Sequence, residues 1–376
     1  MTFERTARGM HKGKVYFRRS PYIVCYWVGT ELVLQNYCTG ARITAEPITS
    51  QVLHFFDRWR SAEALCHRLT EFNAASVRKT VATLARYSFL QCSDVARNAA
   101  ERALLNWKNW DPPAGFFHFS SKDVQYMSDV AETRRSLRRR AERWPVPSSV
   151  KHYPGTRQLG LPPALTQGEF PQVLLSRRTW RRFSAGSMDL EALATLLGLT
   201  WGVQRWVPLA GLGRVALKTS PSAGARHPIE VYVLALRVSG LPRGLYHYAP
   251  DTHRLELLKV GASSKQAVSY LAGQWFFGSA AALMLMTAVF ARSQWKYRDT
   301  RAYRTVLFDA GHICQTFCLV ATWLGLAPFC TAALADTRVE KALGVDGVRE
   351  SVLYAAGVGT RPARTDLAPW PSPRST

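Results

Sequence analysis

The sequence predicts an α+β fold, in which a mixed sheet flanked by helices is preceded by a small module of strands and helices. Polar and apolar residues alternate over residues 15–46, which indicates two or three antiparallel strands with turns at Gly29 and Gly40. Apolar residues at helical spacing follow directly. From Pro171 onward, apolar helices and buried strands alternate up to the strand SVLYAAGVG, residues 351–359.

The composition is that of a folded and strongly basic protein. The chain has 376 residues, of which 47% are hydrophobic, and carries a formal net charge of +23. This length suggests two domains, or one domain with a large appendage. The charge favours an anionic partner such as nucleic acid, an acidic leader peptide, a carrier protein or a phosphate cofactor. A basic surface without a specific partner accounts for the charge equally well.

Seven cysteines, an odd number without any CxxC pair, argue against a disulfide framework and against a structural zinc site. Cys314 and Cys318 share one helix face by spacing, and we interpret them as core residues, so no metal is expected. No apolar segment typical of a secretory signal is visible near the N-terminus, and a cytoplasmic location is expected. The apolar stretch Trp275–Ala291 is shorter than the roughly 18–20 residues that span a bilayer, so no membrane association is expected.

Three segments are predicted. Residues 1–94 form a winged-helix-like module, in which Ser61 caps a helix and residues 74–94 give a further helix and a short strand. Residues 95–165 form a connecting segment that contains the basic helix Arg134–Arg143. Residues 166–376 form the second domain. Its predicted elements are a helix at 189–203, a strand at 228–238, a hairpin at 244–258, a buried strand at 281–290, a long helix at 303–326 and the strand at 351–359.

Three stretches of the second domain carry residues suited to chemistry. In SRRTWRRFSAG, residues 176–186, four arginines surround Thr179, and guanidinium groups pair bidentately with phosphate oxygens. In PSAG, residues 221–224, Ser222 and Gly224 allow the main chain to lie against a ligand, since glycine has no side chain in the way. The alternatives are a solvated basic turn and an ordinary turn before a strand.

The third stretch places Lys296 next to Tyr297, after an apolar strand and before a long helix. Catalytic groups collect at strand ends in sheets of this kind. The two side chains form a candidate proton-transfer pair, provided that burial lowers the pKa of the lysine. A surface lysine beside a tyrosine is the alternative.

The order of these stretches resembles the nitroreductase-like flavoprotein superfamily. Within it, PSAGARHPIEVY followed by KY and by AGHICQ is similar to the SagB-type azoline dehydrogenases, which form thiazoles and oxazoles in modified peptides. The resemblance covers residues 166–362, and residues 1–94 resemble the winged-helix, peptide-binding segment often fused ahead of such enzymes. It implies an FMN cofactor, held by Arg177, Arg178, Thr179, Arg181, Ser222, Ala223, Gly224, Gln315 and Arg361.

The resemblance also implies a reaction and its partners. Lys296 and Tyr297 fall on the pair that moves protons while FMN takes a hydride from a peptide azoline, which becomes an azole. A precursor peptide or peptidyl intermediate, a cyclodehydratase complex and a homodimer are the implied partners. Arg226 and His227 stand where the family has an apolar residue and a tyrosine, so they are candidate substrate contacts and the reaction itself could differ.

Three alternatives stay open at this point. A SagB-type enzyme could act on another peptidyl or carrier-bound intermediate, and an NAD(P)H-dependent nitroreductase shares the fold. No GxGxxG motif after a strand encodes a nicotinamide domain. A flavin-dependent nucleic-acid-binding regulator is the third. Residues 75–87 offer only two basic residues before Arg86, a modest recognition helix, so nucleic acid is not the expected partner.

Overall fold

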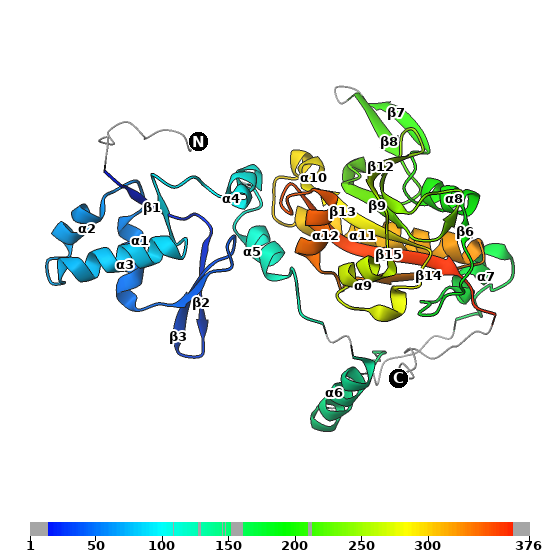
Figure 1. The fold of residues 1–376 in the computed structure, drawn as a ribbon, viewed down its shortest axis with the longest axis horizontal. Helices are drawn as coiled ribbons and strands as arrows, with labels where there is room; N and C mark the ends of the chain where they lie inside the picture. The colour runs from blue at the N-terminus through cyan, green and yellow to red at the C-terminus, as the bar shows by residue number, and fades with distance from the viewer. Residues whose placement is uncertain are drawn as a thin grey trace. The chain divides into compact units, whose positions relative to one another are not determined.

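The computed structural model describes residues 14–107, 109–126, 129–144, 146, 148–151, 161–209 and 213–363 (Figure 1). The chain divides into two compact units. One comprises residues 1–122 together with Arg298–Tyr303, and the other comprises 123–297 and 304–376. The first unit therefore extends beyond the boundary predicted at residue 94, because Trp107 and Trp110 of the expected connecting segment are buried and contact each other at 5.7 Å between ring centroids.

The first unit contains a three-stranded antiparallel sheet in the order β2-β3-β4, and a separate pair of β1 with β5. Its elements are β1 (Phe17–Arg19), β2 (Ile23–Val28), β3 (Glu31–Asn36), β4 (Arg42–Thr44), α1 (Pro47–Phe55), α2 (Ala62–Arg68), α3 (Ala74–Arg86), β5 (Leu90–Cys92), α4 (Ala99–Leu104), η1 (Leu105–Trp107) and α5 (Pro113–Ser120). The strands expected over residues 15–46 are confirmed.

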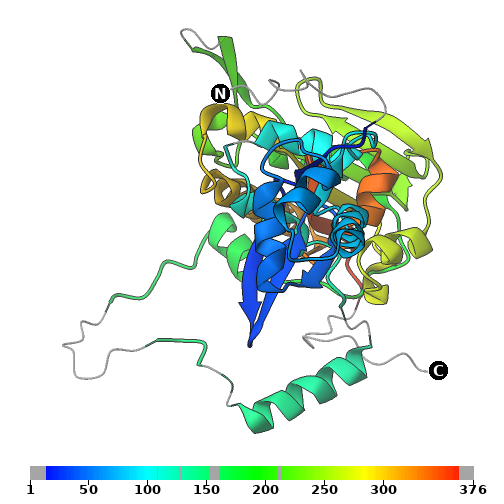
Figure 2. The same cartoon turned by 90° about the vertical axis from the view of Figure 1, so that its left-hand side faces the viewer.

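Helices α1, α2 and α3 share a core with the strands. Figure 2 draws these helices beside the strands, in blue. Leu34, Phe56, Leu65 and Phe89 are fully buried in that core. The predicted cap is confirmed, since the Oγ atom of Ser61 accepts a hydrogen bond from the Ala64 amide at 3.3 Å. This bond satisfies one of the amides that the first turn of α2 leaves without a helical partner.

The second unit carries the larger sheet. Its elements are α6 (Val130–Arg143), α7 (Glu169–Ser176), β6 (Met188–Asp189), α8 (Leu190–Thr200), β7 (Arg205–Leu209), β8 (Gly213–Leu217), η2 (Ala223–Ala225), β9 (Ile229–Ala235), β10 (Val238–Ser239), β11 (Gly244–Ala249), β12 (Arg254–Val260), α9 (Ser264–Tyr270), η3 (Trp275–Phe277), β13 (Ala282–Val289), α10 (Phe290–Lys296), α11 (Ala302–Trp323), β14 (Leu326–Thr331), α12 (Asp336–Leu343) and β15 (Glu350–Thr360). The strands and helices predicted from periodicity are all present.

The α+β class is confirmed, with one correction to the sheet. The six strands follow the order β12-β11-β9-β13-β15-β14, and all five pairings are antiparallel rather than mixed. The described parallel pairing joins β6 and β10, which form a separate two-stranded sheet. Buried apolar strands such as β13 do not reveal their direction, because both faces are covered in either arrangement.

Helices cover both faces of this sheet. On one face, Leu234, Leu283 and Leu285 form a core with α9 and α12. Strand register places Met284 beside Ala356, which in turn lies opposite Cys330 on β14. These residues face α11, because Cys330 contacts cysteines of that helix. The sheet is therefore a middle layer, and α11 lies on the face that also carries the site.

Helix α11 is, among the described helices, long and apolar enough to cross a membrane by length and composition alone. Half of its most apolar window is buried inside the unit. Val306, Phe317 and Ala321 are completely buried, and Phe317 contacts Trp201 at 5.9 Å between ring centroids. The helix therefore packs as a core element of this unit.

Candidate functional site

The PSAG turn lies directly against the lysine–tyrosine pair. A Cβ atom placed on Gly224 would stand 2.6 Å from Nζ of Lys296 and 2.7 Å from the hydroxyl oxygen of Tyr297, so any other residue would displace these side chains. Gly224 has φ of 60°, and Ala225 and His227 also have positive φ, of 53° and 44°. Left-handed backbone at non-glycine residues costs free energy and concentrates at functional sites. The structure thus brings together two of the three predicted stretches.

Helix α11 anchors the turn. The Oγ atom of Ser222 donates to Oδ2 of Asp309 at 2.5 Å, and the Ala223 amide donates to Oδ1 at 3.3 Å. Two turns along the helix, Thr316 shares a hydrogen bond with Ser220 at 2.7 Å between hydroxyl oxygens. Asp309 is buried, and this burial raises the pKa of its carboxyl group, although the bond from Ser222 acts in the opposite direction. The buried carboxylate fixes the backbone of the turn.

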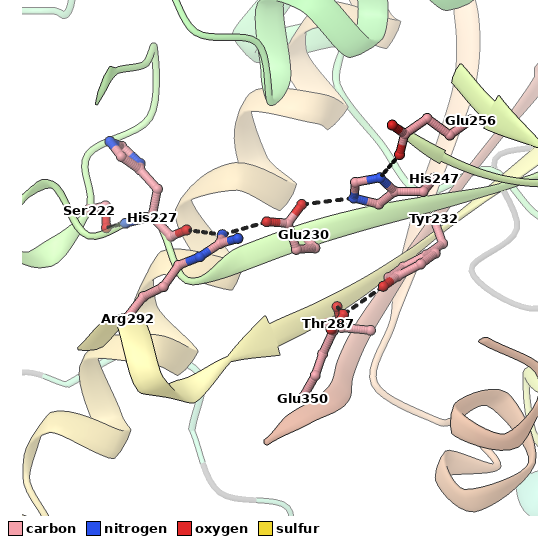
Figure 3. A network of polar contacts seen from close by, with 9 residues as sticks. All are labelled: Ser222, His227, Glu230, Tyr232, His247, Glu256, Thr287, Arg292 and Glu350. Carbon is pink, nitrogen blue, oxygen red and sulfur yellow. Dashed lines mark hydrogen bonds and ion pairs between the residues drawn. The ribbon is translucent and has the colours of Figure 1, made fainter. Parts of the chain in front are cut away.

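A second anchor holds the helix that ends in the pair. Lys296 is the last residue of α10, and Arg292 lies one turn before it. The Arg292 guanidinium donates to the His227 carbonyl at 2.9 Å and pairs with Glu230 at 2.5 Å (Figure 3). The PSAG turn, the start of β9 and α10 are therefore joined at one guanidinium group.

The ion pair continues across the sheet. Glu230 also contacts Nε2 of His247 at 3.0 Å, while Nδ1 of His247 contacts Glu256 at 2.7 Å (Figure 3). Two carboxylate partners require both ring nitrogens to carry protons. Hydrogen bonding to Glu230 accordingly raises the pKa of His247 to about 9. Burial by itself raises the pKa of the Glu230 carboxyl group. The hydrogen bonds and charges of His247 and Arg292 outweigh burial, so the pKa is lowered.

The predicted substrate residues are held by the protein itself. The His227 ring contacts the Ala216 carbonyl at 2.9 Å, and burial followed by the charge of Lys218 lowers the pKa of His227 to about 4. The neutral ring therefore donates from Nε2 to β8. The Arg226 guanidinium stacks on Trp295 at 5.1 Å from the ring centroid. Contact of Arg226 or His227 with substrate stays a prediction.

Lys218 is a further charged group beside this turn. It directly follows β8, and burial lowers the pKa of its amine to about 8, although the nearby Glu230 acts against this. Lys296, in contrast, is exposed, so the burial assumed in the sequence-based argument is not found for that lysine. The sequence analysis did not single out Lys218, since a lysine in a strand-to-turn connection is common.

The arginine-rich turn forms a second cluster around Trp180. The guanidinium groups of Arg178 and Arg361 lie 4.7 and 5.6 Å from the centroid of this buried ring. Arg361 donates to the carbonyls of Leu326 and Thr322, the latter in the last turn of α11. Burial, followed by the charge of Arg178, lowers the pKa of Arg361. Two cations thus share one aromatic ring.

This cluster fits an anionic group. The Nε atom of Arg178 is buried and has no hydrogen-bond partner among the described residues. Burial alone lowers the pKa of Arg181, and no carboxylate pairs with Arg178, Arg181 or Arg361 in the described part of the chain. A buried donor without an acceptor is costly, and a phosphate oxygen supplies the acceptor that Nε of Arg178 lacks.

The other predicted cofactor residues are placed less closely. Thr179 lies between the two arginine pairs of the turn and is half-buried, as is Arg177. Gln315 is exposed on α11, next to Thr316. Helix α11 connects the two clusters, since Asp309 anchors the PSAG turn and the Thr322 carbonyl accepts from Arg361. The helical rise puts these two anchors about 20 Å apart along the helix.

Several residues that organise the site carry weak signals in the sequence. Asp309 is a lone carboxylate on an apolar helix, a pattern that could have marked it. Glu230 occupies an otherwise apolar strand, and Arg292 is one arginine among many. Their roles depend on contacts between α10, α11 and the PSAG turn, which are far apart along the chain.

The chain is similar to several known proteins. The nitroreductase family model matches residues 174–360. The trifolitoxin-processing protein TfxB of Rhizobium leguminosarum bv. trifolii is 33% identical over 175 residues, which are 45% of this chain and 46% of that protein. The microcin B17-processing protein McbC of Escherichia coli is 29% identical over 131 residues, 34% of this chain and 48% of that protein. The chain thus spans about half the length of both proteins.

Among solved structures, the chain is similar to one chain of the E. coli microcin synthetase McbBCD complex with truncated pro-MccB17 bound. The match has 20% identity and a TM-score of 0.47, and covers 69% of this chain and 97% of the other. The family match encloses the arginine-rich turn, the PSAG turn and the lysine–tyrosine pair. Residues 174–360 are therefore a nitroreductase-family domain.

Proposed function

We propose that this domain binds FMN and oxidises an azoline ring of a modified peptide to an azole. The observation that carries the proposal is the closeness of Lys296 and Tyr297 to Gly224, where an added Cβ atom would lie 2.6 and 2.7 Å from their Nζ and hydroxyl oxygen atoms. The absence of a side chain at Gly224 lets Lys296 and Tyr297 pack directly against the turn, so two proton-transfer groups stand beside the backbone that we propose to border the flavin ring. The strained, doubly anchored backbone keeps this arrangement in place.

The residues present fit FMN at its charged end as well. Arg178 offers a buried guanidinium nitrogen that has no hydrogen-bond partner among the described residues. The guanidinium group of Arg361 lies near the same Trp180 ring as that of Arg178. In the proposal, Arg177, Arg178, Arg181 and Arg361 hold the phosphate, and Thr179 contacts the ribityl chain. Ser222, Ala223 and Gly224 hold the ring, and Gln315 contributes from α11.

When bound, FMN supplies the acceptor for a hydride from the azoline ring. The protein's own residues handle the proton that leaves the neighbouring carbon. Lys296 and Tyr297 are adjacent, with Nζ 5.5 Å from the phenol ring centroid, so they can pass a proton between them. The ring loses one hydride and one proton, and the resulting azole is aromatic. Arg292 acts as a positioning residue, because it holds α10 against the PSAG turn.

The relatives support a peptide substrate. TfxB is named as a trifolitoxin-processing protein and McbC as a microcin B17-processing protein. We infer that the first unit, with its winged-helix-like module, recognises the precursor peptide, and that a cyclodehydratase complex supplies the azoline. In the described sheet β2 pairs only with β3, which leaves its other edge for an added strand. Trp27, 68% exposed on β2, offers an aromatic contact there.

A homodimer belongs to the same proposal. The outer side of α11 exposes Phe308 and Trp323, although the Trp323 indole nitrogen donates to Glu169. Exposed aromatic residues on a helix otherwise packed in the core suit a contact with a second copy.

A second candidate function keeps FMN and changes the substrate. Arg226, stacked on Trp295 beside the turn, favours a carrier-bound or peptidyl intermediate with a negative charge.

One experiment tests the function directly. Purified protein should be yellow, release FMN on denaturation, and convert a thiazoline- or oxazoline-containing peptide to the azole with a mass loss of two hydrogens. Protein that binds FMN and oxidises only NAD(P)H would contradict azoline oxidation. Colourless protein that refuses added FMN would contradict the cofactor assignment.

A further inference from the structure

Three cysteines that are dispersed in the sequence meet in the core of the nitroreductase-family domain. Cys314 and Cys318 lie one turn apart on α11, and Cys330 lies on β14. Their Sγ atoms are all within 4.8 Å of one another. Cys314 and Cys318 are 3% and 4% exposed, whereas Cys330 is half-buried. The spacing of the pair on α11 gave no metal motif, because the third thiol comes from a neighbouring strand.

The geometry of the trio is close to that of a metal site. Zinc–sulfur bonds of about 2.3 Å in a tetrahedral site put thiolate sulfurs about 3.8 Å apart. The observed separations require an inward shift of at most about 1 Å, which side-chain rotation supplies. A single disulfide would use two sulfurs and leave the third, whereas one thiophilic ion uses all three.

Two neighbours complete the surroundings. The Tyr354 hydroxyl hydrogen-bonds to Cys330, and Arg177 acts electrostatically on both Cys318 and Cys330. Three thiolates with one divalent cation carry a charge of −1, which the nearby positive charge of Arg177 offsets in part. A monovalent ion would leave a larger net charge buried, at a higher cost.

We propose that Cys314, Cys318 and Cys330 bind one Zn²⁺ ion, with the fourth coordination position open toward the Tyr354 hydroxyl or a water molecule. The ion fastens α11 to β14 behind the arginine-rich turn. Such a site is structural rather than catalytic, because Arg178 and the PSAG turn, not these thiols, form the candidate cofactor site. The proposal is independent of azoline oxidation and holds or fails without it.

The test uses the full chain, reduced and treated with a chelator. Titration with Zn²⁺ against a chromophoric chelator should give one equivalent bound, and zinc should raise the melting temperature. Co²⁺ in place of Zn²⁺ should produce a thiolate-to-cobalt charge-transfer band in the near ultraviolet. Cys330→Ala should weaken zinc binding by at least roughly 100-fold, because losing even an outer partner of a metal ligand costs 10–100-fold.

Matched variants separate the site from general effects on cysteine. Cys25→Ala removes an exposed cysteine of the first unit and should leave zinc affinity, the cobalt band and the zinc-dependent melting shift unchanged. If Cys330→Ala does not show the circular dichroism spectrum of the folded protein, Cys314→Ala is used in its place. The proposal is overturned by zinc binding equal in both variants, by binding of Cu⁺ but not Zn²⁺, or by a disulfide among the three cysteines in reduced-buffer preparations that take up no zinc.

Discussion

The position of a Cβ atom on Gly224 lies 2.6 Å from the Nζ atom of Lys296. The turn between β8 and β9 therefore lies against the end of α10, and a side chain at position 224 would displace Lys296 or Tyr297. Asp309 fixes one side of this contact and Arg292 the other. The predicted ring-binding turn and the predicted proton-transfer pair are one structural unit.

Gly224→Ala should disrupt that unit. The added methyl group meets Lys296 and Tyr297, and the residue also keeps a left-handed backbone. Overpacking costs about 1–3 kcal/mol and left-handed alanine about 1–2 kcal/mol. We expect a lower melting temperature together with loss of azoline oxidation.

Gly261→Ala is the matched control. Its φ of 82° imposes the same backbone strain, but nothing lies within 4 Å of the added Cβ. It should lower the melting temperature modestly and leave oxidation intact. Equal losses of activity in both variants would show that backbone strain, rather than contact with the pair, limits the site.

Lys296→Ala and Tyr297→Phe should retain FMN and lose oxidation. Proton transfer by a positioned side chain contributes about 100- to 10,000-fold to a rate. Single-turnover reduction of the flavin by substrate measures the step directly. Lys265→Ala, an exposed lysine on α9, should behave as wild type. Flavin reduction at the wild-type rate in both pair variants would assign them a structural role only.

Arg178→Ala should weaken FMN binding and leave riboflavin binding almost unchanged, because riboflavin lacks the phosphate. A hydrogen bond to a charged group is worth about 1.5–3 kcal/mol, or roughly 10- to 150-fold in the dissociation constant. Fluorescence titration with both flavins gives the two constants. Arg254→Ala, on the exposed strand β12, is the control. A similar loss for both flavins would place Arg178 away from the phosphate.

His247→Gln should change the pH dependence of stability. The folded pKa of about 9 lies above the ordinary histidine pKa of 6.5, so the stabilisation is complete below about pH 6.5 and is lost as pH rises toward 9. Wild-type protein should therefore exceed the variant in melting temperature at pH 6.5 by more than at pH 9. Lys218, with a pKa lowered to about 8, acts in the opposite direction in both proteins and cancels in the difference. A pH-independent difference would contradict the ion-pair assignment.

Trp27→Ala should weaken binding of the precursor peptide without changing oxidation of a short leaderless substrate. Buried aromatic anchors in interfaces are often worth about 2 kcal/mol or more, roughly 30-fold in affinity. Tyr87→Ala, similarly exposed at the end of α3, is the control. Added salt should weaken peptide binding, since opposite charges speed and stabilise the encounter. Salt-sensitive binding of duplex DNA with no peptide binding would instead favour the regulator alternative.

Local patterns in the sequence were sufficient for most elements. The uninterrupted apolar run of β13 and the turn between β11 and β12 are set by neighbouring residues, so periodicity and turn chemistry predict them. Strand direction in the main sheet and the extent of the first unit depend on contacts between distant segments. Trp107 and Trp110 illustrate this, since aromatic residues in an expected connector turned out to be buried.

The candidate site shows the same division. The PSAG turn and the lysine–tyrosine pair are short contiguous motifs, and the structure brings them together as predicted. Asp309, Glu230 and Arg292 act through partners on other elements, which no local pattern encodes. Cys330 is a similar case. It lies on β14 and joins Cys314 and Cys318 of α11 in one group of three thiols, which the spacing on the helix does not reveal.

Helix α11 sets the spacing between the PSAG turn and Arg361, which both form hydrogen bonds with it. Asp309 and Thr316 are seven residues apart and so point the same way, toward the PSAG turn, while Thr322 meets Arg361 near the helix end. Insertion or deletion of one residue between Asp309 and Thr316 would rotate the remainder of the helix by about 100°. Only one of the two anchors could then meet the turn, and Arg361 would lose its acceptor. We therefore expect homologous domains to vary freely in the β7–β8 hairpin but to keep the length of α11 constant across this interval.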